Sequence, residues 1–192
     1  MNACSLAGIL IPLVGLDWIE FRALFDDNKD RSLAHVLVGF YGAYSHYSRG
    51  YFAFTPEFYK EKTPHYLAEV WKEYSKSDSR YVSRDAAVVT AEGITAAIEG
   101  PACLLAVFAI ASRKSYSYIL QFAICLGQLY GCLVYFITAY LDGDNFSISP
   151  FYYWAYYIGA NSPWVVIPNL IAIRSWKKIC AAFQAEKKMK TR

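Results

Sequence analysis

Long apolar runs separated by short polar loops dominate the chain after its first third. An apolar helix of about twenty residues is long enough to cross the hydrocarbon core of a bilayer. Three runs of this kind are clear, at 86–111, 115–141 and 151–173. Two weaker runs precede them: 36–54 is rich in Tyr and Gly, and 4–19 is short, either a truncated first helix or the apolar part of a signal segment. The pattern predicts an all-α integral membrane protein with four to five transmembrane helices.

The composition supports a membrane class. Hydrophobic residues make up 56% of the chain and aromatic residues 18%, with a mean hydropathy of +0.19, more than a water-soluble domain usually carries. The net charge of +3 is small and basic residues are not interleaved with aromatics, so no nucleic-acid partner is expected. No metal site is expected either, because the cysteines stand singly, without the paired spacing of a zinc or redox site. We interpret them as small hydrophobic residues: Cys4, Cys103, Cys125, Cys132 and Cys180.

The segment 65–101 runs from charged residues straight into an apolar span and places Glu92 inside that span. An ionisable group at membrane depth is costly to keep, so it marks a working site by default. Thr95 lies three residues later on the same helical face and bonds either the Glu92 carboxyl or its own backbone. Glu99 follows two turns after Glu92 and is interpreted as a helix-end residue. The competing interpretation of Glu92 is an interfacial helix end whose side chain reaches water.

Basic residues in short loops mark the cytosolic side of a membrane protein. The loop after 111 and the segment after 173 are basic, whereas the 142–150 loop is acidic, so the carboxyl terminus is expected in the cytosol. The residues behind this assignment are Arg113, Lys114, Arg174, Lys177 and Lys178 on the basic side, and Asp142 and Asp144 in the acidic loop.

The tail ends KKMKTR, with Lys188 and Lys190 at the positions of a K-x-K-x-x retrieval signal. This arrangement resembles the signals that keep membrane proteins in the endoplasmic reticulum. A solvated basic tail held by anionic lipid is the alternative.

A polar segment, WKEYSKSDSRY at 71–81, precedes the first clear span. Ion pairs within it are expected to order this lumenal segment, through the group Tyr74, Asp78 and Arg80. Several of its charged residues are also expected on the wet face of an amphipathic helix lying on the membrane, namely Lys72, Glu73, Lys76 and Asp78.

Four motifs in a fixed order carry a family resemblance: WKEYSKSDSRY at 71–81, AEGITAAIEGP at 91–101, GQLYGCLVYF at 127–136 and NSPW at 161–164. In these motifs the chain resembles the emopamil-binding-protein family with its EXPERA domain, the sterol Δ8–Δ7 isomerases, and it is most like the plant members. The resemblance implies a bundle of transmembrane helices that encloses a sterol cavity in the endoplasmic-reticulum membrane. It divides the chain into a divergent amino-terminal segment (1–49), a family-like core (50–183) and a basic cytosolic tail (184–192).

Members of that family move a ring double bond from C8–C9 to C7–C8 through a carbocation, without metal or cofactor. The resemblance implies that Glu92 transfers the proton, while Trp164 and Asn161 stabilise the cation, and that Tyr74 and Thr95 contact the substrate. The implied partners are a sterol substrate, lipophilic amine ligands and membrane lipid, and a possible homodimer is left open. Judged by the residues alone, Trp164 is first an aromatic anchor at the membrane interface.

The segment before Gly50 departs from the family pattern, which carries T-H-x-x-L-E-G there. Residues 44–50 read YSHYSRG, so Ser45 and Arg49 stand at the positions of the family's His and Glu. A cation at Arg49 would oppose a carbocation intermediate. Codons for 35–50 can be chosen so that the same bases, read one place later, encode MCWWAFTGLTHIILEG, which contains the family motif. This match predicts that part of the segment is translated out of frame.

Two functional hypotheses follow. The first is a sterol Δ8–Δ7 isomerase whose relay lacks one acid in the chain as written. The alternative is a non-catalytic membrane protein that binds sterols or lipophilic amines. A structural membrane scaffold would explain the apolar spans but not the four motifs.

Overall fold

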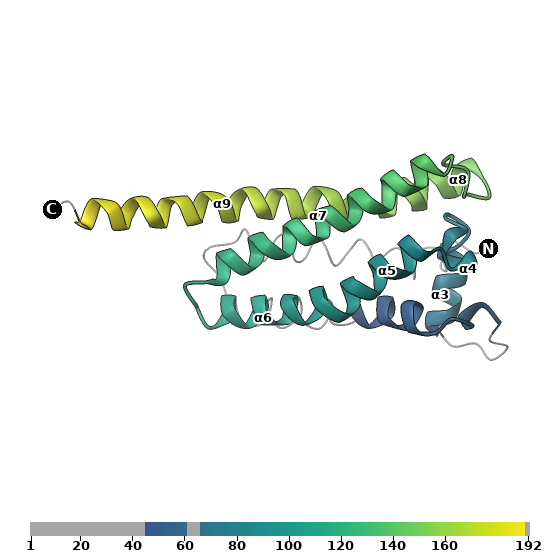
Figure 1. The fold of residues 1–192 in the computed structure, drawn as a ribbon, viewed down its shortest axis with the longest axis horizontal. Helices are drawn as coiled ribbons and strands as arrows, with labels where there is room; N and C mark the ends of the chain where they lie inside the picture. Colours follow the sequence, from purple (N-terminus) through teal and green to yellow (C-terminus); the bar gives the residue numbers. More distant parts are fainter. Residues whose placement is uncertain (1–44, 61–65, 191–192) are drawn as a thin grey trace.

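The computed structural model describes residues 45–60 and 66–190, and every regular element in these two ranges is a helix. The predicted all-helical class is therefore confirmed there, while the run 4–19 lies outside the described residues. Figure 1 shows an elongated bundle in which α5 and α6 run beside α7, α9 lies along α7, and α3 and α4 close one end. A helix at 45–54 comes first, followed by η1 (Phe58–Lys60), α3 (Tyr66–Tyr74), α4 (Arg80–Ser83), α5 (Ala86–Ile94), η2 (Thr95–Glu99), α6 (Gly100–Ala111), α7 (Ser117–Leu141), α8 (Pro150–Tyr152), η3 (Tyr153–Ala160) and α9 (Pro163–Lys190).

The first clear span forms one continuous helix, Ala86–Ala111, built from α5, η2 and α6. Its start is fixed by the Asp85 carboxylate, which accepts hydrogen bonds from the backbone N–H groups of Ala87 and Val88, each at 3.0 Å. In its middle, η2 is a wider π-helical turn that ends shortly before Pro101. Proline lacks an N–H and its ring crowds the carbonyl four residues earlier, which accounts for a wider turn at this place.

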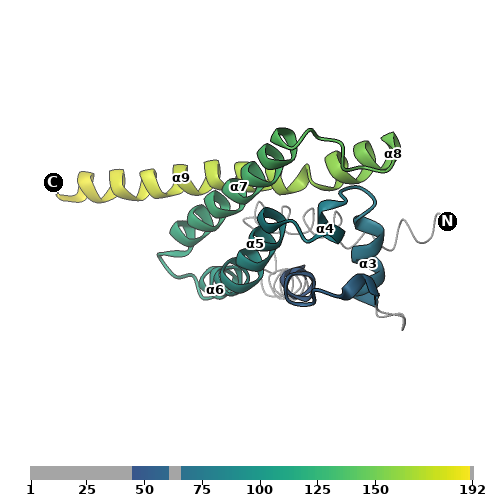
Figure 2. The ribbon, with the colours of Figure 1, turned by 45° about the vertical axis from the view of Figure 1, so that its right-hand side comes forward.

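The next two long helices, α7 and α9, pack along each other. α7 begins at Ser117, two residues later than the predicted span 115–141, and ends at Leu141 as predicted. Figure 2 shows α7 running obliquely, with α9 on one side and the helix made of α5 and α6 on the other. α7 is thus the element that faces both neighbouring layers.

The predicted span 151–173 is not one helix. The π-helix η3 ends before a turn at Asn161 and Ser162, and α9 then runs from Pro163 to Lys190. Proline suits the first turn of a helix, where its missing N–H would lack a helical partner in any case. The expected single helix is therefore corrected to two helices that meet at the NSPW motif.

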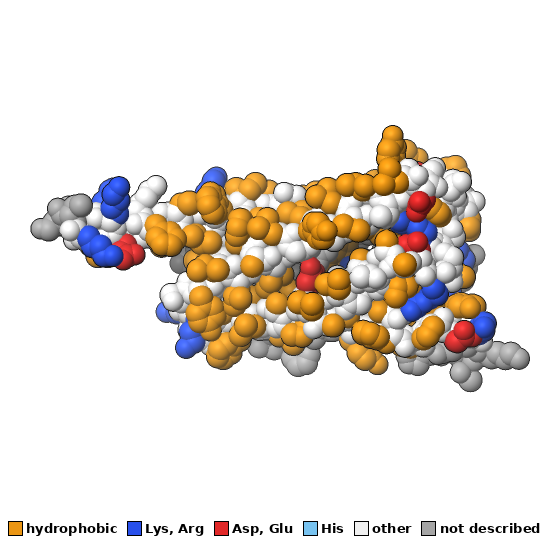
Figure 3. All heavy atoms as spheres, viewed as in Figure 1, with side chains coloured by type: hydrophobic (Ala, Val, Ile, Leu, Met, Phe, Trp, Pro, Cys, Tyr) orange, Lys and Arg blue, Asp and Glu red, His pale blue; other side chains and the backbone are white. Residues whose placement is uncertain are grey.

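Two helices in the described part of the chain, Ala86–Ala111 and Ser117–Leu141, are long and apolar enough to cross a membrane. Their most apolar windows are only 22% and 11% buried, so most of these apolar side chains face outwards. In Figure 3 hydrophobic side chains cover the middle of the visible face, and charged side chains gather mostly at its two ends. This is the surface expected of a helical membrane protein. The weaker run 36–54 is described only from residue 45, where it is helical.

A buried ion pair lies at the end of the bundle near α4. Asp78 and Arg80 are 0% and 3% exposed, and the Arg80 guanidinium donates to the Asp78 carboxylate at 2.7 to 3.1 Å. The Tyr135 hydroxyl on α7 also donates to Asp78, at 2.7 Å. The predicted ion pair between Asp78 and Arg80 is confirmed, whereas Tyr74, the third member of the predicted group, accepts a hydrogen bond from Asn161 instead. The prediction that Asp78 belongs to a wet helix face is wrong, because Asp78 is fully buried. The Arg80 and Tyr135 donors replace the water that its carboxylate has lost.

Candidate functional site

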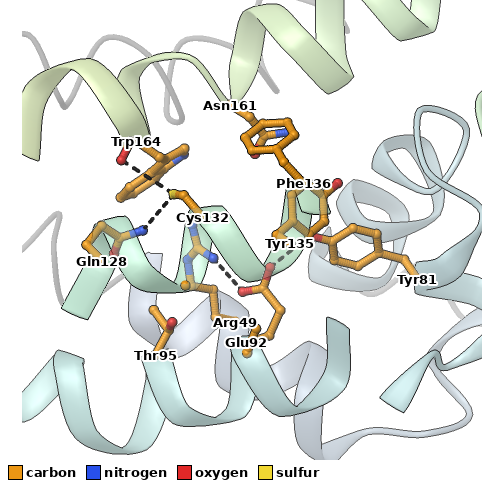
Figure 4. Close-up of a pocket in the computed structure, with 12 residues that line it drawn as sticks. Arg49, Tyr81, Glu92, Thr95, Gln128, Cys132, Tyr135, Phe136, Asn161 and Trp164 are labelled. Carbon is orange, nitrogen blue, oxygen red and sulfur yellow. Dashed lines mark hydrogen bonds and ion pairs between the residues drawn. The ribbon is translucent and has the colours of Figure 1, made fainter. Parts of the chain in front are cut away.

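A small cavity, called the central cavity below, lies between the 45–54 helix, the helix made of α5 and η2, α7, and the turn before α9 (Figure 4). Its volume is about 40 Å³, room for a few water molecules. All four sequence motifs meet here, since each contributes to the wall. The lining residues are Arg49, Tyr81, Ala91, Glu92, Thr95, Gln128, Gly131, Cys132, Tyr135, Phe136, Asn161 and Trp164.

Glu92 is 6% exposed, and Figure 4 shows its carboxylate pointing into the central cavity. Its Oε2 accepts a hydrogen bond from the Arg49 guanidinium at 2.5 Å, and its Oε1 accepts one from the Tyr81 hydroxyl at 2.8 Å. A buried carboxylate is stable only when donors replace its lost water, and these two side chains supply them. The interpretation of Glu92 as a helix end that reaches water is therefore wrong.

Arg49 also contacts Trp164. The Cζ atom of the guanidinium lies 4.6 Å from the centre of the Trp164 ring, a distance at which the π face attracts a cation. The Trp164 ring therefore faces the central cavity, which argues against its alternative as an interface anchor. Arg49, which the sequence analysis expected to oppose a carbocation, thus lies between Glu92 and Trp164.

The position of the 45–54 helix is set by packing and by hydrogen bonds from residues far away in the chain. Trp71 Nε1 donates to the backbone carbonyl of Ser48 at 3.0 Å. Gly50 faces η2, where a Cβ atom at Gly50 would lie in ordinary contact with the Ala96 side chain, 3.5 Å away. These contacts hold the turn that carries Arg49 against the helix that carries Glu92.

The other predicted site residues lie at or just behind the same wall. Asn161 lines the central cavity, and its Nδ2 donates to the Tyr74 hydroxyl and to the Tyr157 carbonyl, both at 2.8 Å. Tyr74 is buried behind Asn161, outside the lining residues, and burial raises the pKa of Tyr74 so that it stays protonated. Thr95 lines the cavity, but its hydroxyl makes no hydrogen bond to Glu92 within the described residues. Substrate contacts of Tyr74 and Thr95 stay predictions.

Tyr81 is a site residue that the sequence analysis missed. It is 2% exposed and donates to a carboxylate eleven positions later in the chain. Burial, and after it the nearby charge of Glu92, raises the pKa of Tyr81, so the phenol remains a donor. The sequence signal for Tyr81 was its position at the end of the motif WKEYSKSDSRY. The sequence does not reveal that its hydroxyl bonds Glu92.

Glu99 lies inside the helix Ala86–Ala111, so its interpretation as a helix-end residue is wrong. A Cβ atom at Gly127 of α7 would lie 3.0 Å from Glu99 Oε1, which means that the glycine makes room for this carboxyl group. The buried Oε2 of Glu99 has no hydrogen-bond partner among the described residues. Glu99 therefore belongs to the contact between η2 and α7, and it is not in the wall of the central cavity.

The central cavity brings the ionisable carboxyl group of Glu92 and the π face of Trp164 into one wall. A buried carboxylate is suited to general acid–base work, and an aromatic face to stabilising a cation. Within residues 45–60 and 66–190, no group of three or more His, Cys, Asp or Glu side chains is arranged to hold a metal ion. The site supports proton transfer beside a positive charge.

Comparison with known proteins gives a family match over residues 66–175, to the family described as EBP, EXPERA (EXPanded EBP superfamily). A protein of Oryza sativa subsp. japonica named "Probable 3-beta-hydroxysteroid-Delta(8),Delta(7)-isomerase" is 74% identical over 155 residues, which are 81% of this chain and 66% of that protein. An Arabidopsis thaliana protein of the same name is 65% identical over 150 residues, 78% of this chain and 63% of that protein. An isomeliandiol synthase of Melia azedarach is 52% identical over 147 residues, 76% of this chain and 69% of that protein. The chain thus spans just under two thirds of the first two relatives.

Proposed function

Because the chain belongs to the EXPERA family (EXPanded EBP superfamily), we propose that it is a sterol isomerase that moves a ring double bond from C8–C9 to C7–C8. The observation that carries this proposal is the buried Glu92 carboxylate in one cavity with the Trp164 ring. The relatives named 3-beta-hydroxysteroid-Delta(8),Delta(7)-isomerases support a sterol as the substrate class.

The proposed reaction adds one proton at C9 and removes one at C7, so no atom or electron is gained overall. Protonation of the C8–C9 alkene leaves a tertiary carbocation at C8, and loss of the C7 proton forms the new double bond. Glu92 is the residue that carries a proton in the cavity. The π face of Trp164 stabilises the cation by about 2 kcal/mol or more when water is excluded. The amide of Asn161 adds a fixed dipole at the same wall.

We also propose a location for this chemistry: a bundle of four to five membrane spans in the endoplasmic reticulum, with the carboxyl terminus in the cytosol. The two outward-facing apolar helices support the membrane, the basic loops support the orientation, and the tail lysines support the compartment. Inside a bilayer the cavity is shielded from bulk water. Charges in the cavity therefore interact more strongly than they would in water.

The substitution Glu92→Gln tests the isomerase. The assay uses a form in which residues 35–50 read MCWWAFTGLTHIILEG, since Arg49 neutralises Glu92 in the chain as written. Glutamine has nearly the same size as glutamate but carries no exchangeable acid, so conversion should fall by about a hundredfold or more while expression persists. Purified protein is incubated with a Δ8 sterol, and gas chromatography with mass spectrometry separates the Δ8 and Δ7 products.

The matched control is Glu69→Gln, which makes the same chemical change in an exposed i,i+3 pair with Lys72. This control should keep its conversion, because exposed pairs contribute little. Near-normal turnover by Glu92→Gln would remove Glu92 from the mechanism.

A second candidate function is non-catalytic binding of a sterol or a lipophilic amine. The observation in its favour is the ion pair between Arg49 and Glu92, which occupies the carboxylate that proton transfer requires. Saturable binding of a Δ8 sterol without conversion, both by the chain as written and by the form with residues 35–50 replaced, would favour this function over the isomerase.

A further inference from the structure

The Arg49 guanidinium lies between an anion and an aromatic face. Its Nη1 is 2.5 Å from Glu92 Oε2, and its Cζ is 4.6 Å from the centre of the Trp164 ring. Figure 4 shows the side chain projecting into the cavity between these two groups. The Arg49 and Glu92 side chains are only 16% and 7% exposed, so bulk water screens their interaction little. A planar, delocalised guanidinium is suited to pairing with a carboxylate while it stacks on a ring.

The backbone that carries Arg49 is fixed on both sides of it. The carbonyl of Ser48 is bonded by Trp71, and Arg84 donates to the carbonyls of residues 52 and 53 at 2.5 and 2.6 Å. A basic side chain on the last carbonyls stabilises a helix end. Arg49 is therefore delivered into the cavity by an ordered helix, and the guanidinium is held there in advance of any ligand.

We infer that Arg49 is the built-in occupant of the cation subsite formed by Tyr81, Glu92 and Trp164, and that its tethered guanidinium keeps a free organic cation of guanidinium or alkylammonium size out of this subsite. The inference rests on the proposed function only for the part this subsite plays in catalysis. A carbocation at C8 needs the same anion and the same π face that Arg49 already holds. The chain as written is accordingly a self-occupied form.

Occupancy by Arg49 limits the volume left in the central cavity and makes Arg49 a competitor of free cations. The central cavity retains about 40 Å³ beside the guanidinium, whereas pockets for sterol-sized ligands measure about 300–1,000 Å³. A tethered group competes with free ligands at an effective concentration of about millimolar or above. Removal of Arg49 should therefore raise the affinity of the subsite for a free small cation by about tenfold or more, since each tenfold corresponds to about 1.4 kcal/mol.

The test compares the full chain with Arg49→Ala, both purified in the same detergent, using ethylguanidinium as a substitute for the missing side-chain head. A ligand that binds only the folded protein raises its unfolding temperature by mass action. Millimolar ethylguanidinium should raise the unfolding temperature of Arg49→Ala saturably and leave that of the unsubstituted chain unchanged. The double variant Arg49→Ala with Glu92→Gln should lose the response, because the anion of the subsite is gone.

The matched control is Arg84→Ala, which removes an arginine that follows α4 and binds the end of the 45–54 helix from outside the central cavity. Its vacated site offers backbone carbonyls and no carboxylate, so ethylguanidinium should give no saturable response. Equal responses of the unsubstituted chain and Arg49→Ala, or an undiminished response of the double variant, would overturn the inference.

A variant that fails to fold does not end the test. If Arg49→Ala is recovered only when ethylguanidinium is present, the recovery itself supports the subsite. If it is recovered in neither condition, Arg49→Gln, whose amide can still donate to Glu92, is titrated with the smaller methylguanidinium, and absence of saturable binding overturns the inference. The ethylguanidinium test needs neither a sterol nor turnover. A failed isomerase assay therefore contradicts the proposed function without affecting the subsite, and a failed ethylguanidinium test contradicts the subsite without affecting the proposed function.

Discussion

At the residue scale, the stability of the buried Glu92 carboxylate depends on two donors with different roles. Arg49 neutralises the charge, and removing one partner of a buried ion pair typically costs about 3–5 kcal/mol. The Tyr81 hydroxyl is neutral and holds the other oxygen, and a hydrogen bond to a charged group contributes about 1.5–3 kcal/mol. Tyr81 therefore orients the carboxylate whether or not residue 49 is a cation.

The substitution Tyr81→Phe tests this orienting bond. It removes one oxygen atom and keeps the ring in its stack on Trp71, whose centroid lies 5.3 Å away. The free energy of unfolding should fall by about 1.5–3 kcal/mol, because a hydrogen bond to a buried charge is lost. Tyr47→Phe makes the same change at a tyrosine that is 63% exposed and should shift stability by less than about 0.5 kcal/mol. Thermal unfolding in detergent measures both, and equal shifts would contradict the assignment.

The sequence predicted which residues line the central cavity better than it predicted their hydrogen-bond and ion-pair partners. Glu92, Asn161 and Trp164 were chosen from short motifs, and all three line one cavity. Their catalytic roles stay predictions. Tyr81 was missed and Asp78 was placed on a wet surface, because burial and pairing depend on residues far away in the chain, such as Tyr135 of α7 for Asp78.

At the element scale, the apolar pattern predicted helix positions better than helix continuity. The span 86–111 was predicted with its observed bounds, since its apolar run has sharp ends. The run 151–173 was predicted as one helix from its apolar residues but is broken at the NSPW motif, where Pro163 begins a new helix. The proline of the NSPW motif is a sequence signal for a helix start, but a prediction from hydrophobicity alone does not use it. The wider π turns were not predicted, because they depend on backbone hydrogen bonding that side-chain polarity does not report.

Two glycines on α7 test how tightly this helix packs against η2. A Cβ atom at Gly127 would lie 3.0 Å from Glu99 Oε1, whereas nothing lies within 4 Å of one at Gly131. Gly131→Ala should therefore stabilise the protein by up to about 1 kcal/mol through helix propensity. Gly127→Ala should be less stable than Gly131→Ala by about 1–3 kcal/mol, because the added methyl group displaces the Glu99 carboxyl group.

Thermal unfolding of the two glycine variants, with and without Glu99→Ala, checks this reasoning as a double-mutant cycle. Removal of the Glu99 carboxyl group should make the two glycine substitutions nearly equal. A difference that persists after this truncation would show that another contact limits the approach of α7 to η2.

At the scale of the whole molecule, the apolar exterior and the charged ends describe a protein placed across a bilayer. The exposed sides of Ala86–Ala111 and Ser117–Leu141 carry apolar residues that would be unfavourable in water. The loop between them is basic, with Arg113 and Lys114, whereas the loop after Leu141 begins with an acid, Asp142. Because these loops lie at opposite ends of the two helices, the charge difference sets the orientation of the bundle.

The orientation leads to a prediction about protease access in sealed microsomes. α9 runs from the acidic-loop end of the bundle past the basic-loop end, as Figure 1 shows, and it terminates in lysines. A tag placed after Arg192 should therefore face the cytosol and be removed by added protease. A tag inserted between Gly143 and Asp144 should be protected until detergent opens the vesicles. A protected tag after Arg192 together with an accessible tag at 143–144 would reverse the orientation, and access to both without detergent would show that the charge bias does not control insertion of this chain.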